Sequence, residues 1–299
     1  MFVPKDVYFR PVQTSYVDVA VNLNRNGNYT SVGNYTMTED GYSEEKFDAL
    51  DVGALTTGSG NKLFTAADKT LEITLYDEDG NETGTTTLTY GEDFQTMGEL
   101  MSAINGFAGV DMKMNDKTGC ETLLQGVEGA EAVYLSFKGE IAKNLNLPAA
   151  MSEIKGETSA TSSPTLQIPT LTVGTDVYDE SGRKYTMENK YYLTTLGEEG
   201  ADSWEVYSKI YNSSTKEQVS ESIVEGVLTF DAEGVPTYEG DTTLTYDGGS
   251  ITFDLTKAGD ITTSNYAYMG SDVKNRDKDG SPEGRLADVS IDSSGIINL

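Results

Sequence analysis

The chain has 299 residues, a length typical of two or three domains. Its 49 acidic and 21 basic residues give a net charge of −28, which disfavours binding to nucleic acids and to anionic membrane surfaces. The sequence contains no histidine and one cysteine, Cys120, which excludes histidine-dependent catalysis, a zinc site built from several thiolates and an intrachain disulfide.

The first ten residues, Met1 to Arg10, lack the apolar segment of a cleaved signal peptide. No stretch approaches 18 uninterrupted apolar residues, so we expect no membrane-spanning segment. If the protein leaves the cytoplasm, we expect a route that needs no cleaved leader, or a leader that is missing from this sequence.

Most of the chain has the pattern of short β-strands separated by polar turns. Residues 17–23 alternate apolar side chains with Asp18, Ala20 and Asn22, which is the period of a half-buried strand. Residues 71–75 and 85–90 flank an Asp-Gly turn and predict a hairpin. Further strands are expected at residues 133–137, 171–178, 190–194, 204–211, 224–230, 242–246 and 251–255.

One helix is strongly indicated at residues 96–105. Thr96 and Glu99 have the spacing of a capping box, and apolar residues follow at positions 97, 100, 101 and 104. Shorter helical turns are expected at residues 140–145 and 148–154. Because all these signals fall between residues 50 and 155, we expect a separate α+β module there, followed by a linker at residues 156–170.

Residues 275–280 resemble the front half of a calcium loop, with Asp277 and Asp279 at ligand positions 3 and 5 and a glycine at position 6. Position 12, which requires a glutamate, is Leu286. A simple turn is therefore the favoured interpretation and an ion site the alternative. No metal, cofactor or catalytic residue is assigned, because no phosphate-binding, dinucleotide or nucleophile motif is present.

Aromatic residues gather around Trp204. Two interpretations stay open for them, the core of a β-sandwich or a sugar-binding face, and the core is favoured. The residues concerned are Tyr185, Tyr191, Tyr192, Trp204, Tyr207 and Tyr211. Cys120 is expected to be a small buried or idle thiol rather than a reactive one.

Two longer segments are more specific. The first begins at residues 175–185 with a V-Y-D-E-S-G turn, continues through W-E-V-Y at 204–207 and ends with L-T-F-D-A-E-G at 228–234. The second covers residues 279–297, D-G-S-P-E-G-R-L-A-D-V-S-I-D-S-S-G-I-I. Together with residues 14–24, and in this order, these segments resemble the bacterial flagellar hook protein family.

The resemblance implies a mainly β fold of several antiparallel sandwiches or barrels with one small inserted α+β domain. It implies an inner domain of residues 1–24 and 269–299, a middle domain of 25–50 and 156–268, and an inserted outer domain of 50–155. The two ends of the chain should then lie close together. The long terminal helices of the family have no counterpart in this sequence, so we expect an internal fragment that is monomeric by itself.

The function implied by the resemblance is structural. The hook is a universal joint that transmits torque from rod to filament, so the expected location is extracellular, and the expected partners are other copies of the protein in a helical tube, together with rod, hook cap and hook–filament junction proteins. Neither a cofactor, a nucleic acid nor a membrane is expected as a partner. The alternatives are an extracellular adhesin or glycan-binding module and, less favoured, a glycosidase-like enzyme that uses two carboxylates.

Overall fold

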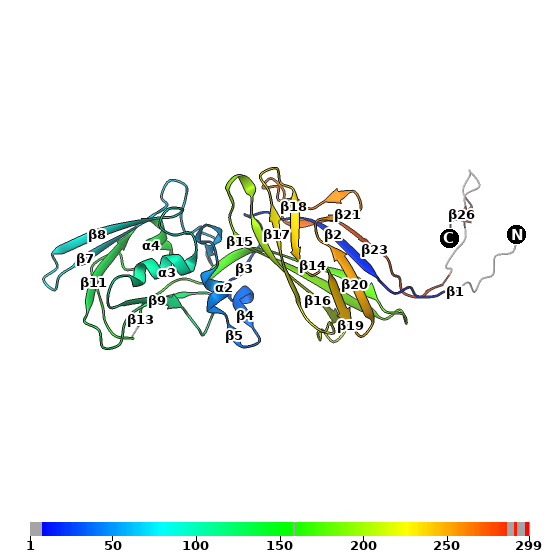
Figure 1. The fold of residues 1–299 in the computed structure, drawn as a ribbon, viewed down its shortest axis with the longest axis horizontal. Coiled ribbons are helices and arrows are strands. Elements are labelled where there is room, and N and C mark those ends of the chain that lie inside the picture. Colours follow the sequence, from blue (N-terminus) through cyan, green and yellow to red (C-terminus); the bar gives the residue numbers. More distant parts are fainter. Residues whose placement is uncertain (1–7, 158, 286–289, 292–296, 299) are drawn as a thin grey trace. The chain divides into compact units, whose positions relative to one another are not determined.

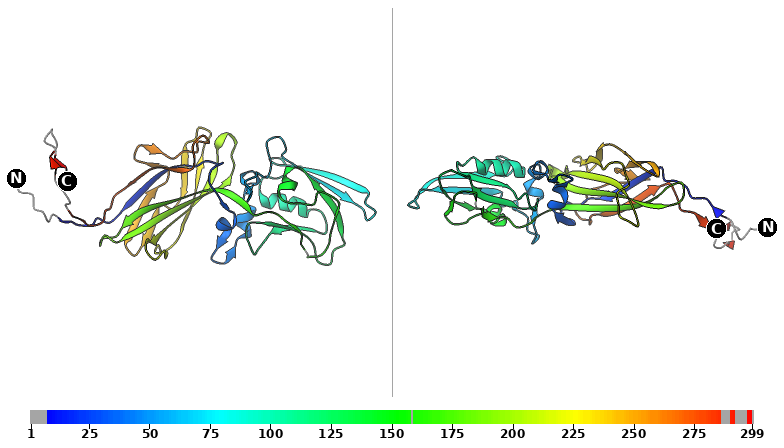
Figure 2. Two further views of the ribbon diagram at one scale, coloured as in Figure 1. Left: turned by 180° about the vertical axis from the view of Figure 1, so that it is seen from behind. Right: turned by 90° about the horizontal axis from the view of Figure 1, so that it is seen from below.

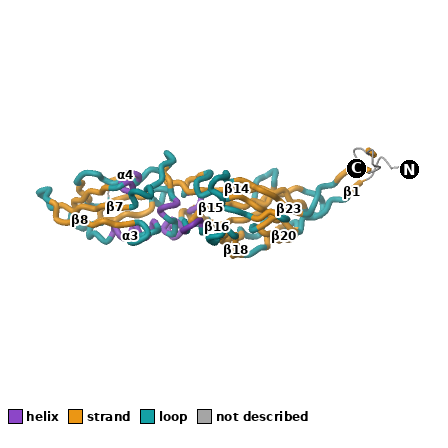
Figure 3. The backbone as a smooth tube through the Cα atoms, turned by 90° about the horizontal axis from the view of Figure 1, so that it is seen from above, coloured by secondary structure: helices purple, strands orange, loops and turns teal. Residues whose placement is uncertain are grey.

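The computed structural model describes residues 8–157, 159–285, 290–291 and 297–298 (Figure 1). The chain forms two compact units. Unit 1 contains residues 1–24, 171–191 and 204–299, and unit 2 contains residues 25–170 and 192–203. The chain therefore passes from one unit to the other four times. Strands predominate in the part described, and every helix described there belongs to unit 2 (Figure 3).

Unit 1 is built from β-sheets. A four-stranded sheet has the order β19-β20-β2-β23, in which β2 runs parallel to β20 and antiparallel to β23. The second sheet has the order β18-β17-β16-β15-β14, and the residues of β15 and β14 that lie between positions 171 and 191 belong to unit 1. The strands of the two sheets are β2 Tyr16–Asn22, β14 Leu166–Tyr178, β15 Lys184–Thr195, β16 Ser203–Asn212, β17 Val224–Phe230, β18 Pro236–Gly240, β19 Thr243–Tyr246, β20 Gly249–Asp254 and β23 Asp272–Lys278. A small hairpin, β21 Lys257–Ala258 and β22 Ile261–Thr262, accompanies them.

The two sheets of unit 1 pack face to face through alternating side chains. Tyr185 of β15 meets Tyr246 of β19 edge to face at 5.2 Å between ring centroids, and Tyr238 of β18 meets Phe253 of β20 at 6.2 Å. Trp204 of β16 is fully buried. Such aromatic contacts bury large apolar areas, so unit 1 is an antiparallel sandwich with one parallel pair, in agreement with the predicted fold class.

Two segments near the ends of the chain, residues 8–22 and 272–285, lie side by side (Figure 2). Strand β1 (Tyr8–Phe9) pairs with β24 (Gly284–Arg285), and β2 pairs with β23 over residues 272–278. The hairpin tip at Gly182 approaches both segments, because a Cβ there would lie 2.8 Å from Pro11 and 3.3 Å from the amide nitrogen of Glu283. The prediction that the ends are close together is confirmed for these residues.

Strand β2 pairs with β23, and β25 (Ser290–Ile291) pairs with β26 (Ile297–Asn298). Residues 286–289 and 292–296 lie outside the described residues. The three-domain division expected from the sequence stays a prediction, and the contacts group the chain in two units.

Unit 2 contains two further sheets, with the orders β12-β11-β7-β8 and β13-β10-β9. Their strands are β7 Thr70–Tyr76, β8 Glu82–Thr89, β9 Val110–Met114, β10 Thr122–Gly126, β11 Val133–Lys138, β12 Ser152–Ile154 and β13 Ser159–Ser162. Short strands β3 Tyr29–Ser31 and β6 Thr56–Thr57 pair with the start of β14, and β4 Met37–Thr38 pairs with β5 Gly41–Tyr42. The helices are α1 Gly33–Thr36, α2 Glu44–Asp48, α3 Met97–Asn105 and α4 Glu140–Asn144, with 3₁₀ turns at Val52–Ala54 and Glu198–Gly200.

Helix α3 confirms the strongest sequence prediction. The Thr96 hydroxyl accepts from the Glu99 amide, and the Glu99 carboxylate accepts from the Thr96 amide, which completes the capping box. The four predicted apolar positions are buried, and the Asn105 side chain bonds both backbone groups of Met112. The helix is thereby fixed against β9.

Asp51 joins three segments of unit 2. This carboxylate is almost fully buried and accepts hydrogen bonds from the Tyr90 hydroxyl at 2.7 Å, the Gln95 amide nitrogen at 2.8 Å and the backbone amides of Gly53 and Leu196. A buried charge is tolerated only when its lone pairs are used in this way, so Asp51 fixes the approach to α3.

Three local predictions are wrong. Residues 148–154 contain strand β12 instead of a helical turn, because Leu135 and Val133 on β11 provide a pairing edge. The expected linker contains β13 and the first residues of β14. Helices also occur outside residues 50–155, at α1 and α2, where Ser43 caps α2 by accepting from the Lys46 amide.

Candidate interaction surface

The residues proposed as a calcium loop are part of a strand and its end. Asp277 lies in β23 and accepts from the Tyr16 hydroxyl at 3.3 Å. Asp279 accepts from the Ser15 amide at 2.7 Å, the Ser15 hydroxyl at 2.6 Å and the Tyr16 amide at 3.1 Å. Among the described residues, no group of three or more His, Cys, Asp or Glu side chains is arranged to hold a metal ion.

The Asp279 carboxylate therefore fastens the start of β2 to the end of β23. Partial burial opposes ionisation, but the hydrogen bonds from Ser15 and Tyr16 outweigh it and hold the pKa of Asp279 below its usual range. The predicted turn is wrong for residues 275–278, because they continue β23, an edge strand, and charged side chains are common on edge strands.

The other sequence candidates are internal. Tyr185, Tyr191, Tyr192 and Trp204 are buried in the sheets, and Tyr207 and Tyr211 are half-buried, so the core interpretation is confirmed for the first four. Cys120 is a free thiol and is buried in unit 2. No helix within the described ranges is long and apolar enough to cross a membrane.

The most exposed aromatic side chain among the described residues, Tyr268, lies in a segment that the sequence did not single out. We call residues 264–271, between β22 and β23, the tyrosine loop. The Tyr268 side chain is 82% exposed and stacks on Tyr266, with ring centroids 5.3 Å apart and planes inclined by 17°. Met269 beside them is also exposed. Large apolar side chains gathered on a surface mark interaction sites more often than single ones do.

Two buried asparagines of the β2 segment hold this loop. The Asn22 side chain donates to the carbonyls of Tyr266 at 3.1 Å and Gly270 at 3.0 Å, and its oxygen accepts from the Tyr266 amide at 2.9 Å and the Ser264 hydroxyl at 2.7 Å. The Asn24 side chain donates to the carbonyls of Ala267 and Met269 at 3.0 and 2.7 Å. The loop thus has a fixed shape although it belongs to neither sheet.

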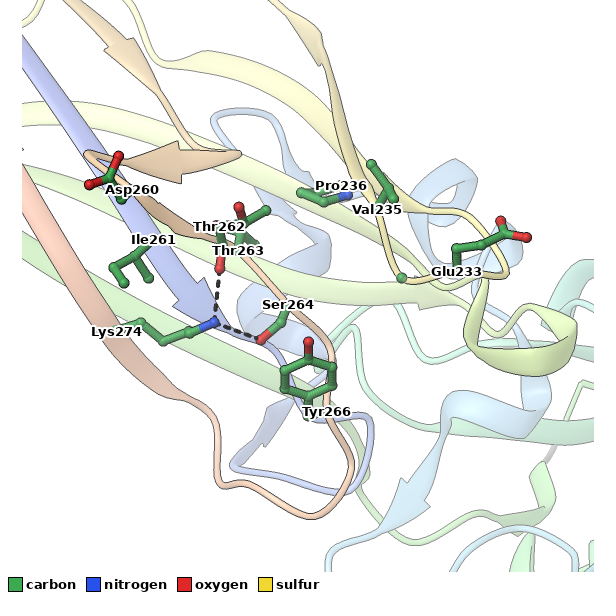
Figure 4. A pocket seen from close by; sticks show the side chains of 11 residues that line it. Glu233, Val235, Pro236, Asp260, Ile261, Thr262, Thr263, Ser264, Tyr266 and Lys274 are labelled. Atoms are coloured by element: carbon green, nitrogen blue, oxygen red, sulfur yellow. Dashed lines mark hydrogen bonds between the residues drawn. The ribbon is translucent and has the colours of Figure 1, made fainter.

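A hollow of about 550 Å³ adjoins the loop (Figure 4). Lys274 of β23 crosses its floor and donates to the Thr262 carbonyl at 2.9 Å and the Ser264 hydroxyl at 3.4 Å, and its ammonium lies 5.7 Å from the Tyr266 ring centroid. Ile261 and Val235 are exposed on its walls. Tyr266 therefore belongs to both the loop and the hollow.

The opposite wall comes from the L-T-F-D-A-E-G motif. The Asp231 carboxylate accepts from the amides of Glu233 at 3.1 Å and Val235 at 2.8 Å, and Gly234 adopts φ +78°, a conformation that favours glycine. The turn at Asp179 repeats this arrangement, because its carboxylate accepts from the amides of Ser181 and Arg183. In both motifs an aspartate therefore shapes a turn.

Comparisons with known proteins identify the architecture. No protein-family model matches the sequence, and no curated protein does. The crystal structure of the Helicobacter pylori flagellar hook protein FlgE2 superposes on 99% of this chain with a TM-score of 0.84 and 24% sequence identity. The chain has the fold of a hook protein.

The match covers 66% of the Helicobacter protein, so this chain spans just under two thirds of its length. A second structure, a 32 kDa fragment of the flagellar hook protein FlgE from Caulobacter crescentus, overlaps 89% of this chain and all of the fragment, with a TM-score of 0.34 and 10% identity, and adds nothing to the fold assignment. The predicted mainly β fold agrees with the first comparison.

Proposed function

We propose that this chain is part of a structural subunit of the bacterial flagellar hook. The observation that supports it is the fold match over 99% of the chain, at a TM-score of 0.84, to a protein described as a flagellar hook protein. The ordered motifs at residues 175–234 and 279–297 resemble the same family. An adhesin or glycan-binding module, the alternative from the sequence, has no support in this comparison.

In this proposal the chain works mechanically and catalyses no reaction. Copies of it assemble into an extracellular tube that bends while it rotates, so contacts between neighbouring copies must form and slide. Small, hydrated contacts slide more readily than large apolar ones. The net charge of −28 keeps neighbouring copies from adhering tightly and makes their contacts sensitive to ionic strength.

The test is a deletion of the gene in its bacterium, complemented by the intact gene. We expect cells without the protein to be non-motile and to lack hooks in electron micrographs, and purified hooks from complemented cells to contain this chain by mass spectrometry. Hooks of normal length and composition in the deletion strain would contradict the proposal.

A further inference from the structure

We propose that the tyrosine loop and the adjoining hollow form a contact surface for a second copy of this chain. The inference rests on the proposed function and adds to it the residues at which neighbouring copies meet. The surface joins an exposed stacked pair, Tyr266 and Tyr268, to a hollow large enough for a side chain of the neighbour.

The distribution of charge identifies the occupant. Residues 261–271 contain none of the 70 charged residues of the chain, although Asp260 and Asp272 flank them. The charges at the adjoining hollow are the two acids Glu233 and Asp260 and the base Lys274. Two copies that each carry a charge of −28 repel each other wherever acidic surfaces meet, so they approach with least repulsion at an uncharged segment. A cationic partner would instead be attracted to the acidic surface outside this loop.

The rigidity of the loop favours binding. Because Asn22 and Asn24 already fix its backbone, little conformational entropy is lost when a neighbour covers it. Tyrosine side chains have few rotatable bonds and combine a large apolar face with a hydroxyl, so they are enriched among the residues that dominate interface energies. Tyr268 and Met269 meet the neighbour's surface, while the hollow accepts one of its side chains.

The contact must join different surfaces of the two copies. A surface that packs on its own equivalent closes a dimer, whereas a tube that grows requires each copy to present one surface and receive another. The tyrosine loop of one copy is therefore expected to contact residues outside 261–271 on the next.

The experiment is site-specific photocrosslinking in cells that assemble hooks from the full-length protein. Tyr268 is replaced by p-benzoylphenylalanine, which is tolerated because the side chain is 82% exposed. Irradiated hooks are purified, and adducts are mapped by mass spectrometry. We expect an adduct with the mass of two copies, in which residue 268 is joined to a peptide outside residues 261–271.

Ile223 provides the matched control. It is exposed in the same unit, at 44%, but lies between Glu221 and Glu225, so the same photoreactive residue there should give little adduct. The inference is overturned if hooks that contain the protein give no adduct at residue 268, an adduct to a different protein, or an adduct between two tyrosine loops. None of these outcomes contradicts the proposed function. Hooks that lack the protein overturn the proposed function itself.

Discussion

Replacing Asn22 with alanine tests whether this one side chain holds the tyrosine loop. Four hydrogen bonds of 2.7–3.1 Å join Asn22 to Ser264, Tyr266 and Gly270, and the side chain is almost completely buried. Asn22→Ala removes all four bonds, and it leaves the partner groups unsatisfied unless water enters.

The expected cost follows from the bonds lost. A buried hydrogen bond contributes about 1 kcal/mol net, so four bonds give an upper value of about 4 kcal/mol. Relaxation and partial hydration reduce this to about 3 kcal/mol. With a denaturant slope of about 2 kcal/mol/M in urea, the unfolding midpoint of unit 1 should fall by about 1.5 M.

The fluorescence of Trp204 measures this change, because it is the only tryptophan in the sequence and is buried in unit 1. Hydrogen exchange gives a second readout. The Tyr266 amide, which donates to the Asn22 oxygen, should lose its protection in the variant. Asn22→Asp keeps the size and the acceptor but faces two carbonyls with a carboxylate, so it should destabilise unit 1 at least as much.

A midpoint shift below about 0.3 M in Asn22→Ala, or an Asn22→Asp variant as stable as the wild type at pH 7, would refute the conclusion that Asn22 holds the tyrosine loop. Asn34→Ala is the control. The Asn34 side chain is exposed in unit 2 and bonds the Thr30 hydroxyl at 2.7 Å, so its loss should leave the Trp204 transition unchanged.

Three further predictions concern other contacts. The first two follow the unfolding of unit 2 by the reaction of the buried Cys120 thiol with a thiol reagent. Tyr90→Phe removes the bond to the buried Asp51 carboxylate and should lower the stability of unit 2 by about 2 kcal/mol; no change in thiol exposure would contradict the role of Asp51. Thr96→Ala removes the cap of α3 and should cost about 1 kcal/mol by the same assay, whereas Thr96→Ser should cost little. Hydrogen bonds lower the pKa of Asp279 in the folded state, so its stabilisation is present above the usual carboxyl value of 3.8 and is lost as the pH falls below it. Asp279→Asn should therefore reduce the loss of unfolding free energy at low pH, as followed by Trp204 fluorescence. The same loss in the variant as in the wild type would refute this assignment.

The elements that could be predicted from the sequence carry their signal locally. The alternation at residues 17–23 gives β2, and the capping box at Thr96 gives α3, because both patterns reflect burial of one face. Strand β23 could not be predicted in this way. Its sequence, D-V-K-N-R-D-K, has almost no apolar residue to bury, and it is held by pairing with β2 at the edge of a sheet.

The tyrosine loop was missed for a related reason. It has no periodic pattern, and its shape depends on Asn22 and Asn24, which are more than 240 residues away along the chain. One signal was available, the absence of charge over residues 261–271 in a chain in which 23% of residues are charged. That absence identifies an unusual segment, but the exposure of Tyr268 follows only from the fold.

The pairing of the segments near the two ends of the chain determines which hydrogen-bonded ladders bear a pull applied there. A pull applied at residues 8 and 285 acts across the ladders of β1 with β24 and β2 with β23, all within unit 1. The segments that form unit 2 depart from unit 1 and return to it, so they lie off this route. Unit 2 therefore carries none of this load, so its size and sequence can diverge without breaking the connection between the paired strands.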